Sequence, residues 1–198
     1  MSIDLKAVIG LGNPGTEHAR TRHNAGFWFA DAVADKFGGS FSKEARFHAH
    51  LATVSVDGHK LWVLKPTTWM NDSGRAVQAL MAFHKLTPHQ VLVVHDELDL
   101  PAGAARLKVG GGHGGHNGLR DTHEQVGADY RRLRIGVGHP GEKHLVTNYL
   151  TSGRPNAADQ KLIDEAIGAA RDALPLVLGN WEKATQQLHS RPLPEGAK

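Results

Sequence analysis

VIGLGNPG, residues 8–15, begins as a short apolar run and carries glycines at positions 10, 12 and 15. A strand that leads through glycines at this spacing into a helix is the pattern of a dinucleotide-binding turn. The overlapping run KAVIGL, residues 6–11, predicts a buried strand, and the apolar spacing of residues 23–37 predicts an amphipathic helix. The stretch therefore predicts an α/β fold that opens with a strand, a glycine-rich turn and a helix.

The context of these glycines argues against a nucleotide cofactor. Pro14 removes one amide from the turn that would meet a pyrophosphate. The acid at about the required distance, Asp31, falls in the middle of the predicted helix, and the next strand is not expected before about residue 47. We therefore expect no cofactor, and we interpret the glycines as a tight turn at the edge of a sheet.

The rest of the chain alternates between strand and helix patterns. Asp57-Gly58 separates two strand-like runs and predicts a hairpin, which makes a mixed sheet the expectation. Ser73 is a candidate cap for a helix over residues 73–86. The other segments are strands at 91–100, 104–109 and 131–138, and helices from 156 onward interrupted near Pro175 and Gly179. We expect one α/β domain, residues 1–190, with a twisted mixed β-sheet flanked by helices, and a polar tail, residues 191–198.

Composition limits the possible chemistry and location. The chain has no cysteine, which excludes disulfides, thiolate nucleophiles and zinc–thiolate sites. Charges at positions 4 and 6 interrupt the N-terminal segment, and no window approaches the roughly 18 apolar residues of a membrane span. We expect a soluble cytoplasmic protein with no membrane contact. The 23 Lys and Arg against 20 Asp and Glu, with 14 histidines, favour a polyanionic partner.

Polar side chains follow several of the predicted strands. Asn13 comes after the first strand, Asn71 after the second strand of the hairpin, and Asp96 after the apolar run VLVV. Asn117 lies in the glycine-rich stretch 110–118, after the strand-like run AARLKV, and His23 opens the first helix. Because binding groups in α/β sheets gather outside the carboxyl ends of the strands, we expect these side chains to share one crevice.

These residue types point to hydrolysis by activated water. A histidine beside a buried carboxylate is a common general base, which makes His23 and Asp96 the candidate centre of the site. The chain has no cysteine and no GxSxG elbow, so water is the expected nucleophile, and asparagine amides could hold the substrate. Alternatively, His23 could be an ordinary helix cap, and Asp96, in HDELD, could bind Mg²⁺ or lie on a solvated turn.

Other nearby residues leave two interpretations open. Trp69 and Met70, beside Asn71, could stack on a base or pack in the core. His113 and His116 could bind a metal or belong to a flexible loop, whose free amides would suit a phosphate. A metal-dependent hydrolase using these histidines with the HDELD carboxylates, and an RNA-binding protein without catalysis, are therefore the competing hypotheses.

The motifs GLGNPG, TRHNAG, KPTTWMNDSG, VVHDELDLPAGAARLKVGGGHGGHNGL and RLRIGVGHPG occur in this order over about residues 6–185. Together they resemble the motifs of the bacterial-type peptidyl-tRNA hydrolases. The resemblance implies a monomeric single-domain α/β enzyme that hydrolyses the ester between a peptide and the 3′-terminal ribose of tRNA. It also implies that the enzyme needs no metal, cofactor or protein partner.

The resemblance also implies roles for individual residues. His23 matches the catalytic base, and Asp96 matches the acid that holds it. Asn13 matches the residue that helps to discriminate N-blocked from free aminoacyl substrates. Asn71 and Asn117 match amides that bind substrate and position water.

Further residues match positions around this centre. The resemblance implies that Met70 packs at the site and that Lys108 and Arg134 hold tRNA phosphates. Trp69 stands where the family usually has Phe or Tyr. His18 stands where the family pattern has Tyr, at a position associated with tRNA contact, so a titratable ring replaces a phenol there.

Overall fold

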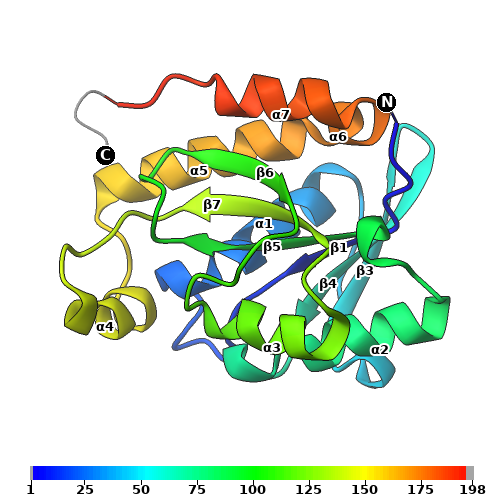
Figure 1. Ribbon diagram of the computed structural model, residues 1–198, viewed down its shortest axis with the longest axis horizontal. Helices are drawn as coiled ribbons and strands as arrows, with labels where there is room; N and C mark the ends of the chain where they lie inside the picture. The colour runs from blue at the N-terminus through cyan, green and yellow to red at the C-terminus, as the bar shows by residue number, and fades with distance from the viewer. Residues whose placement is uncertain (1, 195–198) are drawn as a thin grey trace.

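The computed structural model describes residues 2–194 and consists of a twisted β-sheet with helices on both faces (Figure 1). Among the residues described, the sheet has seven strands in the order β2-β3-β4-β1-β5-β7-β6. The strands are β1 (Ala7–Gly10), β2 (Ser42–Glu44), β3 (Ala49–Val56), β4 (His59–Pro66), β5 (Val91–Glu97), β6 (Ala105–Val109) and β7 (Arg131–Gly136).

The sheet is mixed, as the hairpin pattern predicted. Strand β1 pairs in parallel with β4 on one side and β5 on the other, and β5 pairs in parallel with β7. The pairs β2–β3, β3–β4 and β6–β7 are antiparallel. Asp57 and Gly58, between β3 and β4, both have positive φ, which is the backbone of the tight hairpin turn that their sequence predicted.

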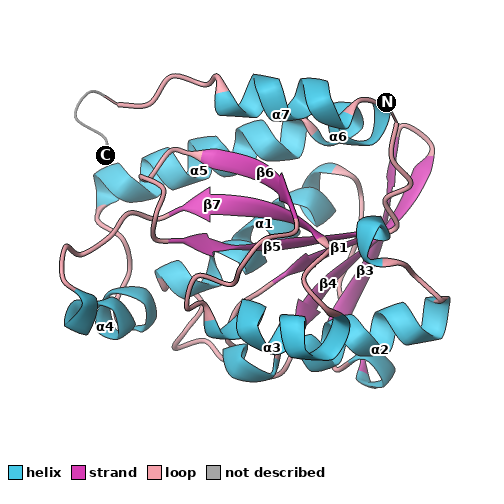
Figure 2. Ribbon diagram, viewed as in Figure 1, coloured by secondary structure: helices cyan, strands magenta, loops and turns pink. Residues whose placement is uncertain are grey.

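Seven α-helices lie among the residues described, and they cover both faces of the sheet (Figure 2). They are α1 (Ala25–Lys36), α2 (Gly74–His84), α3 (Asn117–Val126), α4 (Val146–Thr151), α5 (Ala157–Asp172), α6 (Leu174–Gly179) and α7 (Trp181–His189). Short 3-10 turns precede several of them, including η1 (Arg22–Asn24), η3 (Met70–Asp72) and η5 (Lys143–Leu145).

The two faces of the sheet form two hydrophobic clusters. Val8 and Leu92 point into the cluster with α1, α5, α6 and α7, whereas their neighbours Ile9 and Val93 point into the cluster with α2 and α3. Side chains alternate along a strand, so strands covered on both sides must be apolar throughout. This requirement explains why the central strands read as continuous apolar runs, and the predicted α/β class is confirmed.

Some sequence predictions differ from the structure at element boundaries. Helix α2 ends at His84 rather than residue 86, because Lys85 takes a left-handed conformation with φ 55°. Ser73 does not cap α2: its hydroxyl donates to the Met70 carbonyl at 2.7 Å instead. Strand β5 ends at Glu97, where the chain turns away from the sheet, rather than at residue 100.

The sequence patterns did not predict β2, α3 or α4. Strand β2 is a three-residue edge strand with no buried residue, and α4 buries only Leu150. Helix α3 buries only Gly118, Leu119 and Thr122 and is otherwise polar. Elements that bury so little apolar surface leave almost no periodic signal in the sequence.

The predicted polar tail begins after α7, which ends at His189. Arg191 is not free, since its guanidinium donates to the Gly103 carbonyl at 2.8 Å. The last part of the predicted tail, residues 195–198, lies outside the described residues. None of the helices described is long and apolar enough to cross a membrane.

The glycines of the opening stretch, residues 8–15, allow helix α1 to pack closely against the chain, and they also allow the chain to turn. A Cβ on Gly10 would collide with the Gly26 carbonyl, and a Cβ on Gly12 would lie 2.7 Å from the Phe27 ring. Helix α1 begins only at Ala25, well after the glycines, so the turn does not lead directly into a helix as the dinucleotide pattern requires. Gly15 alone of the three has positive φ, at 98°.

The contact between α1 and the sheet predicts a pair of opposite stability effects. Gly26→Ala should destabilise the protein by about 2–3 kcal/mol, because the added Cβ meets backbone atoms of Leu11 and Val94 that cannot move aside. Gly168→Ala, in α5, should instead stabilise by up to about 1 kcal/mol, because its Cβ would find only the end of Arg171, at 3.5 Å. Urea unfolding of both variants measures this difference, and equal free energies of unfolding would contradict it.

Candidate active site

The predicted site residues gather at the carboxyl ends of the central strands. Asn13 follows β1, Asn71 lies in η3 after β4, and Asp96 lies near the end of β5. Asn117 begins α3, and together with His23 and Asp96 it lines a cavity of about 400 Å³. The structure thus brings these five residues to one edge of the sheet, as predicted from their positions after strands or, for His23, at the start of the first helix.

His23 and Asp96 form the buried centre of this edge. The 3-10 turn η1 places His23 so that its Nδ1 lies 2.8 Å from Asp96 Oδ2. Only 7% of His23 and 2% of Asp96 are exposed. With Nδ1 donating to the carboxylate, Nε2 is the ring nitrogen left to accept a proton.

His116 holds the other oxygen of the same carboxylate. Its Nε2 lies 2.8 Å from Asp96 Oδ1, while its Nδ1 accepts from the amides of Gly118 and Leu119 at the start of α3. A nitrogen that accepts two N–H groups carries no proton, so Nε2 must carry it and donate to Asp96. His116 is therefore neutral and caps α3. Sequence reasoning placed it only in a loop or a metal site, because α3 itself was not predicted.

Charge and burial set the protonation of this group. Burial alone would raise the pKa of Asp96, but His23 and His116 lower it far below its ordinary value. Burial would likewise lower the pKa of His23, but the Asp96 charge and hydrogen bond outweigh it and raise that pKa above 6.5. Burial lowers the pKa of His95 to about 3, so this ring stays neutral while it contacts the Asp96 carbonyl. Asp96 therefore stays ionised, and its charge favours the protonated form of His23.

His23, Asp96 and His116 are also the group of side chains, among the residues described, that could hold a metal ion. Ligand atoms of His23, Asp96 and His116 all lie within 4.8 Å of one another. In this arrangement both ring nitrogens nearest the carboxylate donate their protons to it. Of the metal set predicted with His113, the structure brings His116 and Asp96 together, whereas His113 is not part of this cluster and its Nδ1 accepts from the Gly115 amide.

Asn13 is held by a second asparagine. Asn24, 1% exposed, accepts from the Asn13 amide at 2.8 Å and donates to the Asn13 carbonyl at 3.0 Å. The Asn13 Oδ1 accepts from the Met70 amide at 2.7 Å, which leaves its Nδ2 as the free donor. Sequence reasoning missed Asn24, although it directly follows His23 in TRHNAG.

Met70 and Trp69 occupy opposite environments beside this asparagine. Met70 is 4% exposed and packs against Gly118, where an added Cβ would lie 2.6 Å from its sulfur. Trp69 is 54% exposed and meets the His18 ring edge-to-face at a centroid distance of 5.6 Å. Trp69 is therefore not a core residue, and its indole is available at the rim of the site.

Lys108 and Arg134 lie on a separate basic surface and do not line the cavity. In the β6–β7 pair, Arg106 lies opposite Arg134, and Lys108 lies opposite Arg132. Cross-strand partners share a face, so four cationic side chains lie on the face of β6 and β7 opposite the α5 and α7 side. Arg106 was missed, although the alternation in ARLKV would place it beside Lys108.

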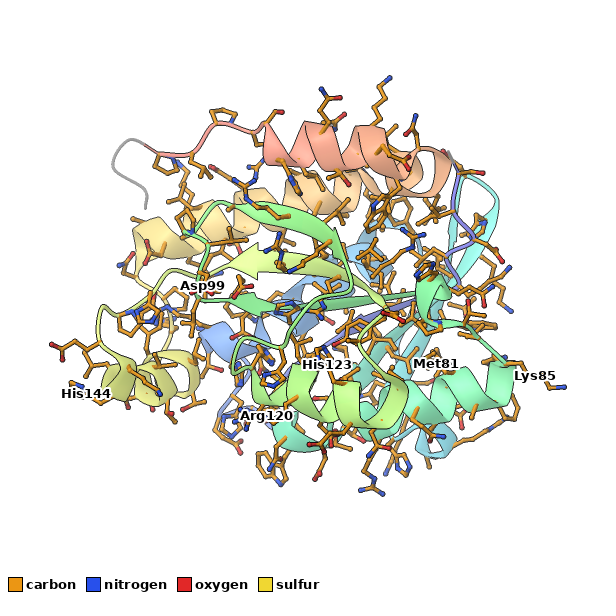
Figure 3. All side chains as sticks on the ribbon, in the orientation of Figure 1. Met81, Lys85, Asp99, Arg120, His123 and His144 are labelled. Carbon is orange, nitrogen blue, oxygen red and sulfur yellow. The ribbon has the colours of Figure 1, made fainter. Side chains whose placement is uncertain are left out.

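Arg132 fastens the glycine-rich loop to this surface. Only 2% exposed, it donates to the carbonyls of Gly111 and Gly112, the latter at 2.6 Å. It also lies 3.0 Å from His123 Nε2, on the sheet-facing side of α3 (Figure 3). Burial, Arg132 and His113 lower the pKa of His123, so it stays neutral and can accept from the guanidinium. The loop that carries His116 is thus anchored.

Two further hollows bear on the predicted site. Asn71 and Asn117 line a shallow one of about 260 Å³ with Arg120, Asp121 and Glu124. A larger hollow, about 540 Å³, lies between α1 and α5 and contains none of the predicted site residues. Size alone therefore does not identify the site; the buried histidine–carboxylate centre does.

Comparisons with known proteins identify the family of this chain. The family model described as "Peptidyl-tRNA hydrolase" matches residues 7–195. The chain belongs to the peptidyl-tRNA hydrolase family. It is 49% identical over 193 residues to a peptidyl-tRNA hydrolase of Neisseria gonorrhoeae (strain NCCP11945), covering 96% of this chain and 100% of that protein. It is 50% identical over 191 residues to one of Azoarcus sp. (strain BH72), covering 96% and 86%.

Solved structures of the family have the same fold. The crystal structure of peptidyl-tRNA hydrolase from Acinetobacter baumannii superposes with a TM-score of 0.91 at 42% identity, covering 96% of this chain and 97% of that one. A purine nucleoside phosphorylase from Toxoplasma gondii, at 8% identity and a TM-score of 0.52, shares the general fold alone.

The opposing effects of burial and of the Asp96 charge predict how the pKa of His23 changes when that charge is removed. The pKa of His23 should lie above 6.5 in the wild type and fall in Asp96→Asn, because the charge that raises it is removed while burial remains. Titration of the ring ¹⁵N signals by NMR measures both values. An unchanged pKa in Asp96→Asn would show that this carboxylate does not control the base.

Proposed function

We propose that this enzyme hydrolyses the ester between a peptide and the 3′-terminal ribose of tRNA, and so recycles tRNA from prematurely released peptidyl-tRNA. The observation that carries the proposal is the buried His23–Asp96 hydrogen bond of 2.8 Å, in a chain that belongs to the peptidyl-tRNA hydrolase family. The proposed reaction uses no metal and no cofactor. It acts on N-blocked aminoacyl groups.

His23 is the proposed general base. Its Nε2 takes a proton from a water molecule as the water oxygen attacks the ester carbonyl carbon. When the tetrahedral intermediate collapses, the bond to the ribose oxygen breaks and the imidazolium returns the proton to that oxygen. The products are the peptide carboxylic acid and a tRNA with a free 3′-hydroxyl.

Asp96 stabilises the imidazolium that forms in this step. Because His116 donates to Oδ1, the carboxylate is held in place while Oδ2 accepts from His23. A buried carboxylate so oriented fixes the tautomer of the base and offsets its developing charge. His116 acts through Asp96 and is a positioning residue.

The asparagines are the proposed substrate contacts. The free Nδ2 of Asn13 would bind the carbonyl of an acylated amino group, and Asn71 and Asn117 would bind the ester region and the water. A free aminoacyl ester would present an ammonium there instead. Leaving a buried donor unpaired costs about 1–3 kcal/mol per group, which supports selectivity for N-blocked substrates.

The tRNA phosphates are proposed to bind to the basic surface of β6 and β7, through Lys108, Arg134 and Arg106. Trp69 and His18 at the rim suit a base or ribose near the ester. Recognition would follow phosphate position and shape, because no base-reading module is evident.

We further propose that residues 1–190 act as one domain, with 191–198 as a polar tail. The enzyme would work as a cytoplasmic monomer with tRNA, and without a membrane or an obligatory protein partner. Sedimentation of the purified chain measures the oligomeric state, and a stable dimer would contradict this part of the proposal.

The reaction is tested with N-acetylaminoacyl-tRNA beside unblocked aminoacyl-tRNA, both with EDTA present. The wild type should cleave only the blocked substrate, and His23→Ala should lose at least about 10³-fold in kcat, because the base is removed. As His23 must be neutral to act, kcat/KM should rise with pH through its raised pKa. Binding of tRNA without cleavage would support a non-catalytic relative, and EDTA-sensitive cleavage would support a metal enzyme.

The basic surface is tested by salt dependence. Removing one phosphate contact with Arg106→Gln or Lys108→Gln should weaken tRNA binding and reduce the slope of log affinity against log salt by about 0.7–0.9. Lys43→Gln, on edge strand β2 at the far side of the sheet, is the matched control and should keep the wild-type slope. Equal slopes in all variants would exclude this surface from RNA binding.

A further inference from the structure

Helix α4 forms one wall of the cavity beside His23, yet it stands away from the main helical layers (Figure 1). Val146, Thr147, Leu150 and Thr151 of α4 line the cavity. Of these four, only Leu150 is buried. Something other than a hydrophobic core must therefore hold this wall in position.

Arg22, the residue before His23, makes that connection. Its guanidinium lies over the Tyr149 ring, 3.9 Å from the centroid, and its Nη1 donates to the Tyr149 carbonyl at 3.2 Å. The Tyr149 hydroxyl in turn donates to the Val137 carbonyl, just after β7, at 2.6 Å. Burial raises the pKa of Tyr149, so this hydroxyl keeps the proton that it donates.

The charge of Arg22 has no acidic partner among the residues described. Arg22 is 8% exposed, and its Nε is buried without a hydrogen-bond partner. A buried cation is normally paired with a carboxylate, because desolvating it alone is costly. Here the aromatic face and the carbonyl oxygen of Tyr149 stabilise the Arg22 charge instead. The pairing of Arg22 with α4 is thus a specific contact of the fold.

We propose that Arg22 and Tyr149 are positioning residues that fix α4 as the wall of the cavity contacted by the acyl part of the substrate. This inference rests on the proposed function. The turn η1 directs His23 toward Asp96 and Arg22 toward α4, so one short turn sets the distance between the base and the wall. The cavity-lining residues of α4 itself are uncharged, which suits an uncharged acyl or peptide group. Lys143 and His139, which line the same cavity, precede the helix.

The test compares Tyr149→Leu, which removes ring and hydroxyl, with Tyr149→Phe, which removes only the bond to Val137. Tyr149→Leu should raise KM about five- to tenfold with little change in kcat. Without the Arg22–Tyr149 contact, α4 binds the acyl group more weakly, and this loss is the same in the ground state and the transition state. The rise should be larger for N-acetylphenylalanyl-tRNA than for N-acetylglycyl-tRNA. The KM of Tyr149→Phe should lie between those of Tyr149→Leu and the wild type.

Two readouts separate positioning from general instability. Hydrogen exchange over residues 143–151 should accelerate in Tyr149→Leu and stay slow in Val77→Ala. Val77 lies in α2, in the hydrophobic cluster on the other face of the sheet, which contains no residue of α4. The inhibition constant of deacylated tRNA should not change in Tyr149→Leu, because the wall contacts the acyl part only.

The outcomes distinguish this inference from the proposed function. If the wild type fails to cleave N-acetylaminoacyl-tRNA, the proposed function falls, while the exchange measurement still decides whether Tyr149 holds α4. If the wild type cleaves and Tyr149→Leu lowers kcat alone, the contact acts on His23 and the inference is wrong. A parallel rise in KM and in the inhibition constant of deacylated tRNA would also overturn it, since the wall would then bind RNA.

Discussion

The carboxylate of Asp96 is the interaction on which the rest of the site depends. It is 2% exposed and accepts a ring N–H from His23 on one oxygen and from His116 on the other. A buried charge is tolerated only where donors replace the lost water, so these two rings are needed for Asp96 to stay ionised. In the proposed reaction that retained charge makes His23 a stronger base than a free histidine.

Three different segments must meet for this arrangement to exist. Strand β5 supplies Asp96, η1 supplies His23, and the capped start of α3 supplies His116. The close approach of α1 to β1 and β5, which Gly10 and Gly26 permit, brings η1 to the end of β5. The packing of α1 against β1 and β5 therefore determines the position of His23 Nε2, the nitrogen that accepts the proton.

Two arginines hold the outer parts of the site to this centre. Arg132 binds the carbonyls of the glycine-rich loop ahead of His116, and Arg22 binds Tyr149 on α4. Both are buried, and in the part of the chain described neither forms an ion pair with a carboxylate at 4 Å or less. Guanidinium groups can make several hydrogen bonds in fixed directions, which suits them to tie loops and short helices that bury little apolar surface.

The sequence by itself determined the α/β class, the mixed sheet and the five residues at the strand ends, because strand patterns and turn residues are local properties. His23, Asp96, Asn13, Asn71 and Asn117 could be named because each follows or opens a recognisable element. The tertiary structure alone decided the partners: His116 on Asp96, Asn24 on Asn13, and Arg106 beside Arg134. These pairs join segments far apart in the chain, or depend on a polar helix or strand pairing, so no local pattern encodes them.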